Sequence, residues 1–186
     1  MTDNNPVFQN SILFCQKALR REVERITEDM LFQDAGGKGL VKLKVYDQKL
    51  PVPRGKVREM EDAEESIDFI GDQVENAIVQ CPWCKVVANN GRVKEAAERQ
   101  QVQLCVILGI FNDGERNSGY EETVNIIQRF LNRFSENPFL EEQFEQVGEM
   151  NWEVNDDQDT FPYTFGAITV TFEIKGMRRT WGEEFL

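Results

Sequence analysis

The 186-residue sequence contains no histidine. Histidine is the most common general base in enzymes, a frequent metal ligand and the side chain that titrates closest to physiological pH. Its absence removes serine–histidine catalysis and histidine-based metal sites together. Basic residues are also few: 21 lysines and arginines stand against 33 acidic residues, for a net charge of −12. We therefore do not expect the surface as a whole to bind nucleic acid, because neutralising phosphates requires lysine and arginine.

Cysteines and long apolar runs are scarce as well. The four cysteines, at positions 15, 81, 84 and 105, do not form the dense pattern of a small disulfide-linked secreted domain. Cys15 and Cys105 lie within apolar runs and are predicted to be small core residues. The first residues show neither the basic nor the apolar region of a signal peptide, and no apolar run is long enough to span a bilayer. We therefore expect a protein that is kept in a reducing cytoplasm or carried out inside a larger particle.

The hydrophobic pattern alternates between the periods of helices and strands. Helices are predicted over residues 8–32 and from Ser118 to about Asn137, where Pro138 ends the second helix. Strands are predicted over residues 40–46, 77–88, 101–111, 144–154 and 160–175. This order predicts an α+β fold, with an antiparallel-rich sheet of about four to five strands and two principal helices packed on one face.

The chain length fits a single domain over residues 1–186. Within it we predict an acidic loop or insertion at about residues 54–76 and a C-terminal tail at about residues 176–186. The acidic segment lacks a continuous apolar face, which is typical of a solvated loop or of an arm that docks on a basic partner. Its candidate docking residues are Glu59, Glu61, Asp62, Glu64, Glu65 and Asp68.

The last predicted strand has the clearest pattern in the chain. Ile168, Val170, Phe172 and Ile174 alternate with threonine, glutamate and lysine, so one face is expected to be buried and the other exposed. The turn before it is rich in aromatic residues and ends at Gly166, which we predict to lie where two backbones approach too closely for a side chain. Asn89-Asn-Gly91, earlier in the chain, is a strong turn signal.

The motif Cys81-Pro-Trp-Cys84 suggests a thiol–disulfide redox centre or half of a zinc site. A redox pair requires its first cysteine at the start of a helix, whereas the residues after Cys84 have a strand pattern. A zinc site requires about four ligands, and the other two cysteines lie in separate apolar runs. We therefore assign no catalytic, cofactor-binding or metal-binding residue and expect a protein that is not an enzyme and has no cofactor.

Five stretches from residue 101 onward occur together in one order. They are Gly109-Ile-Phe-Asn-Asp113, Val124-Asn-Ile-Ile-Gln-Arg-Phe-Leu131, Asn137-Pro-Phe-Leu140, Asn151-Trp-Glu153 and Phe161-Pro-Tyr-Thr-Phe-Gly166. With these stretches the chain resembles the tail-terminator, or tail-completion, proteins of long-tailed bacteriophages and of phage-tail-like particles. The resemblance covers roughly residues 100–181 well and residues 8–53 loosely. Its structural markers are Trp152, Tyr163, Phe165 and Gly166.

The resemblance implies a structural protein of the virion neck, assembled in the bacterial host cytoplasm. Such a protein forms a homo-oligomeric ring, usually a hexamer, that caps the tail tube, stops its polymerisation and joins the tail to the head. The implied partners are the tail tube protein, the sheath protein where a sheath exists, and the head connector or stopper protein. DNA only passes through the lumen, and no membrane is involved. Two alternatives stay open: a neck connector on the head side and, from another class, a C-x-x-C thiol redox protein.

Overall fold

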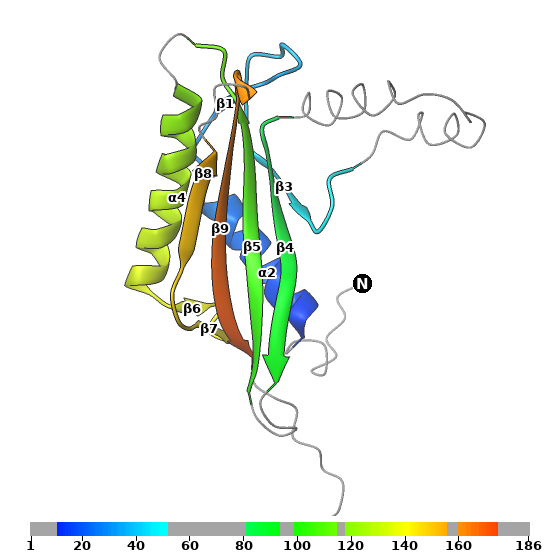
Figure 1. The fold of residues 1–186 in the computed structure, drawn as a ribbon, viewed down its shortest axis with the longest axis vertical. Coiled ribbons are helices and arrows are strands. Elements are labelled where there is room, and N and C mark those ends of the chain that lie inside the picture. Colours follow the sequence, from blue (N-terminus) through cyan, green and yellow to red (C-terminus); the bar gives the residue numbers. More distant parts are fainter. Residues whose placement is uncertain (1–10, 52–80, 94–98, 115–117, 156–159, 175–186) are drawn as a thin grey trace, which may run out of the picture.

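The computed structural model describes residues 11–51, 81–93, 99–114, 118–155 and 160–174 (Figure 1). These ranges contain two helices and nine strands. The helices are α2 (Ile12–Ile26) and α4 (Ser118–Glu136). The strands are β1 (Phe32–Gln33), β2 (Leu40–Val41), β3 (Lys44–Asp47), β4 (Trp83–Val93), β5 (Gln100–Phe111), β6 (Phe139–Leu140), β7 (Phe144–Gln146), β8 (Asn151–Asn155) and β9 (Tyr163–Ile174).

Seven of these strands form one sheet with the order β3-β4-β5-β9-β7-β6, and β8 pairs with β9 beside this path. β3 runs parallel to β4, and the other pairs in the sheet are antiparallel. β4, β5 and β9 are the long central strands (Figure 1). β1 and β2 form a separate two-stranded antiparallel sheet.

The predicted fold class, with about four to five antiparallel-rich strands and two principal helices, is therefore wrong. The described residues form a mixed seven-stranded sheet and nine strands in all. Residues 40–46 divide into β2 and β3, which belong to different sheets, and residues 144–154 divide into β7 and β8. In addition, β1 and β6 have two residues each, too few to produce a detectable period.

Helix α2 begins after Ser11, whose hydroxyl oxygen accepts a hydrogen bond of 3.2 Å from the backbone N–H of Phe14. This is the bond expected of an N-terminal capping serine. Helix α4 ends before Asn137-Pro138, as predicted from the proline. Neither helix of the described ranges is both long and apolar enough to cross a membrane.

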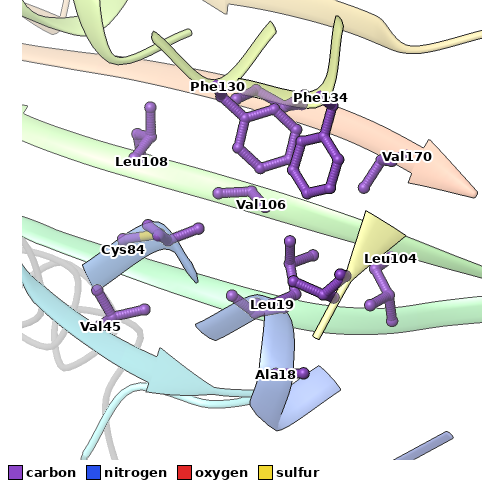
Figure 2. Close-up of a cluster of buried hydrophobic side chains, with 14 of the residues drawn as sticks. Ala18, Leu19, Val45, Cys84, Leu104, Val106, Leu108, Phe130, Phe134 and Val170 are labelled. Atoms are coloured by element: carbon purple, nitrogen blue, oxygen red, sulfur yellow. The ribbon is translucent and has the colours of Figure 1, made fainter. Parts of the chain in front are cut away.

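A single hydrophobic core joins both helices to one face of the sheet. Phe130 and Phe134 of α4 point toward Val106 and Val170, while Leu19 comes from α2 (Figure 2). The rings of Phe130 and Phe134 lie 4.8 Å apart between centroids. Aromatic side chains of this size bury a large apolar area each, so they hold the helices firmly against the sheet.

An ionic cluster fixes the two helices relative to each other. Arg133 of α4 donates to the carboxylate of Glu22 on α2, and Arg25 donates to the same carboxylate at 2.5 Å. Glu22 is only 9% exposed, and a buried carboxylate is costly without a partner. The two arginines compensate its charge. Arg129 of α4 adds a bidentate pair with Asp29, at 2.5 and 3.1 Å. The helical layer thus behaves as a single support for the sheet.

The predicted acidic insertion at residues 54–76 and the predicted tail at residues 176–186 lie outside the described residues.

Candidate functional site

The sheet face opposite the helices is covered by neither helix of the described residues, and most of its central residues are partly exposed. Side chains of β4, β5, β8 and β9 alternate between the helical side and this second face. On β9 the burial pattern alternates strictly between partly buried and buried residues, as predicted. We call the second face the open face; its central residues are Trp83, Lys85, Cys105, Ile107, Phe165, Ala167 and Thr169.

On the open face, a tryptophan packs over a glycine. Gly109 of β5 pairs with Trp83 of β4 on one side and with Phe165 of β9 on the other. A Cβ atom added at Gly109 would lie 2.5 Å from the indole ring of Trp83. The Trp83 and Phe165 rings are 6.3 Å apart between centroids, and the Lys85 ammonium lies 5.9 Å from the Trp83 ring. The missing side chain at Gly109 therefore lets two aromatic rings meet across three strands.

The aromatic turn before β9 is fixed from both sides. The carbonyl of Pro162 accepts a hydrogen bond of 3.0 Å from the backbone N–H of Asn112, the residue after β5. One residue later, the Tyr163 and Phe111 rings lie 5.3 Å apart on paired positions of β9 and β5. These contacts set the register of the longest strand pairing in the sheet, which runs from Phe111 opposite Tyr163 to Gln100 opposite Ile174.

Gly166 lies on the helical side of β9, not on the open face. A Cβ atom added there would lie 2.6 Å from Cγ2 of Thr123 and 3.6 Å from Cδ1 of Ile127, both on α4. The nearest backbone atom, the carbonyl oxygen of Glu153, would be 3.7 Å away. The predicted close approach thus exists, but the neighbour is a helix side chain and not a second backbone.

Trp152 also belongs to the helical side, because it pairs with Ile168 of β9. Its side chain is 52% exposed. The four markers of the resemblance therefore do not form one site. Tyr163 and Phe165 contribute to the open face, whereas Gly166 and Trp152 lie beneath it, on the side of α4.

A shallow depression of about 440 Å³ lies on the open face. Its lining includes the apolar residues Ile107, Phe165 and Ala167 and the acidic residue Glu153. A carboxylate beside an apolar surface suits contact with another protein, where the apolar part is buried and the charge gives orientation.

The cysteine pair is arranged unfavourably for redox chemistry. Cys81 and Cys84 are fully buried, and Cys84 opens strand β4 together with Trp83 instead of starting a helix. Burial raises the pKa of the Cys81 thiol to about 12 and also raises the pKa of Cys84 well above its ordinary value. Both side chains are therefore protonated thiols at neutral pH, whereas the reactive form of cysteine is the thiolate.

The other two cysteines differ from each other. Cys15 is fully buried on α2, as predicted for a small core residue. The same prediction is wrong for Cys105, which lies partly exposed on the open face. Among the described residues, no three histidine, cysteine, aspartate or glutamate side chains are grouped as metal ligands. The candidate docking residues Glu59 to Asp68 lie outside the described residues.

The open face itself was not identified from the sequence. Its signal is present in β5, where Cys105, Ile107 and Gly109 make the outward positions apolar as well as the inward ones. Such a strand predicts a central place in the sheet, which is confirmed, but it does not reveal that no helix of the described chain covers the second face.

Comparison with known proteins provides no relative. No protein-family model matches the sequence, and no curated protein matches it. A function for this chain is therefore argued from its own residues.

Proposed function

We propose that this chain is a structural protein of a bacteriophage or phage-tail-like particle, a tail terminator that forms a ring on the end of the tail tube. The observation that carries the proposal is the open face, where Ile107 and Phe165 are partly exposed beside the buried Trp83. A surface that joins apolar residues to a few charges is suited to burial against another protein. The family named in the proposal rests on the resemblance carried by the motifs from Gly109 to Gly166.

The mechanism of a terminator is geometric. A tube grows because each added ring presents the same surface that it has just covered, which is the property of an open heterologous polymer. Growth stops when a subunit binds this surface and presents a different one in its place. The two sides of the present sheet differ in this way, since one is covered by α2 and α4 and the other is the open face.

The charge of the chain fits the same role. A net charge of −12 is unfavourable for binding the phosphates of DNA that passes through a ring. The buried, protonated thiols of Cys81 and Cys84 favour this structural role over thiol redox chemistry.

The proposal is tested by removing the gene from the phage or particle and measuring tails by electron microscopy. We expect tails that are longer than normal and variable in length, or tails that do not join heads, and we expect the wild-type gene supplied in trans to restore both. Tails of normal length that still join heads would reject the proposal. Co-purification with the tube protein supports the tail side of the joint, whereas co-purification with the head connector alone contradicts it.

A further inference from the structure

Two edge strands of the seven-stranded sheet, β3 at one end and β8 beside β9, carry opposite charge. The first is the β3 edge, formed by the exposed residues Lys42, Lys44 and Lys49 with Tyr46. None of these lysines forms an ion pair with an acidic side chain of the described chain. The nearby carboxylate of Asp47 is bound by Arg20, at 3.3 Å. The positive charge at this edge is therefore available to a partner.

The second is the β8 edge, formed by Glu149, Trp152 and Glu153. All three side chains are exposed, and neither glutamate forms an ion pair with a basic side chain of the described chain. On the side away from β9, no strand of the described residues pairs with β8. The edge thus combines negative charge, an exposed indole and an unpaired strand, which are three features of a surface that receives a partner.

The two edges also match in the direction of their side chains. Lys44 pairs with Trp83 and Glu153 pairs with Ala167, so both belong to the open face. Val45 and Trp152 belong to the helical side, because they pair with Cys84 and Ile168. The opposite charges of Lys44 and Glu153 therefore lie on the same side of the two edges, whereas on the helical side Val45 is buried in the core and Trp152 is exposed. A shift of one residue would destroy this match, so the pattern also fixes a register.

We propose that copies of this chain associate head to tail, with the β8 edge of one copy against the β3 edge of the next. A second copy is the favoured occupant because each edge carries the charge that the other lacks, whereas two identical edges repel each other. β3 and β8 run in opposite directions within the sheet, so copies in the same orientation meet as antiparallel neighbours. A head-to-tail contact closes into a ring when its rotation permits, and this closure rests on the proposed function.

The test is a charge exchange measured by sedimentation velocity on the full chain. Lys44→Glu and Glu153→Lys should each weaken self-association by about tenfold or more, because each places like charges across the contact. The combined variant should recover association, since every contact again joins opposite charges. Lys17→Glu and Glu28→Lys, at exposed positions on and just after α2, serve as matched controls and should leave association unchanged. Added salt should weaken the wild-type association.

Several results would overturn the inference. These are a wild-type chain that stays monomeric at every soluble concentration, reversals without effect, or a combined variant that does not recover. The inference is also overturned if deleting residues 57–75 abolishes association while Glu153→Lys leaves it intact. The lysines of the β3 edge would then bind the acidic segment of a neighbouring copy and not its β8 edge. The two proposals can fail separately. If the chain associates through these edges but its loss leaves tails normal, the edge contact is supported and the terminator function is rejected. If its loss gives abnormal tails but the charge reversals have no effect, the terminator function is supported and the edge contact is rejected.

Discussion

At Gly166, strand β9 lies close against helix α4. Its missing side chain makes room for Thr123, which is fully buried and whose hydroxyl donates a 2.8 Å hydrogen bond to the carbonyl of Gly119. Gly119 repeats the arrangement from the helix side, since a Cβ atom there would lie 2.9 Å from Oγ1 of Thr164. Two glycines, one on each element, therefore set the distance between the start of α4 and β9.

Replacing Gly166 should destabilise the fold. Gly166→Ala places a methyl group against Thr123 Cγ2, and we expect the free energy of unfolding to fall by about 1–3 kcal/mol. The measurement is urea denaturation of the purified protein. Thr123→Ser removes the obstructing methyl group while keeping the hydroxyl, so adding it to Gly166→Ala should recover part of the loss. Ala167→Val, one residue further and on the open face, is the control and should change stability by less than about 0.5 kcal/mol. A double variant no more stable than Gly166→Ala would contradict the explanation.

At the scale of single residues, the sequence predicts which positions are tightly packed more reliably than it predicts which residues they contact. Gly166 was expected to be tightly packed, and it is, but its neighbour comes from a helix more than 40 positions away in the chain. Periodicity carries no information on such distant partners. The apolar run around Cys105 predicts a core position for this residue, but only the arrangement of the helices decides which side of the strand is covered.

At the scale of elements, the strands that could be predicted are those with strict alternation. β9 and the central place of β5 follow from their residue patterns. β4 does not, because Asn89-Asn-Gly91 predicts a turn, whereas the strand continues through these residues to Val93 with an irregularity between Ala88 and Asn90. A Cβ atom at Gly91 would lie 2.8 Å from the carbonyl oxygen of Gln101. Pairing with β5 therefore outweighs the local turn preference, and the glycine is needed for close contact between strands.

Strand β5 permits a direct comparison of the two faces of the sheet. Val106 is buried beneath the helices, and the next residue, Ile107, lies on the open face. Val106→Lys should reduce the free energy of unfolding by several kcal/mol or prevent folding, because it buries an unpaired charge. Ile107→Lys should leave the protein folded, with a change of about 1 kcal/mol or less. Both are measured by thermal and urea denaturation.

The functional part of this comparison is complementation of a phage that lacks the gene. If the open face contacts a partner, Ile107→Lys should fail to restore normal tails even though it folds. Lys85→Ala is a suitable companion, since it changes an already polar position of the same face and should restore tails at least in part. An Ile107→Lys protein that is folded and fully active would show that the open face does not serve the proposed function.

At the scale of the whole molecule, the distribution of charge matters more than its sum. The net charge of −12 is visible in the sequence, but the basic and acidic edges are not. The lysines of the β3 edge and Glu149 and Glu153 of the β8 edge lie about a hundred positions apart, and they become opposite edges only through the strand order. That order depends on the parallel pairing of β3 with β4, two strands that are separated in the sequence by residues 48–82. A pairing between such distant strands has no signature in the local residue pattern.

The head-to-tail contact makes a prediction that a symmetric dimer does not. Lys44→Glu blocks the β3 edge and leaves the β8 edge intact, whereas Trp152→Glu blocks the β8 edge and leaves the β3 edge intact. Each variant alone should be monomeric. When they are mixed, the intact β8 edge of the first should bind the intact β3 edge of the second. The remaining two edges both carry a substitution that weakens the contact, so assembly should stop at one-to-one dimers.

Native mass spectrometry of the mixture distinguishes these species, because isotope labelling of one variant separates mixed pairs from self-pairs. Trp152 is 52% exposed, so its replacement should lower the free energy of unfolding in part but leave the protein folded, which denaturation of each variant checks. A symmetric contact through β8 would instead leave Lys44→Glu able to pair with itself and Trp152→Glu unable to pair at all. Mixed pairs that stop at two copies are expected only when the two edges of one subunit bind different edges of its neighbours.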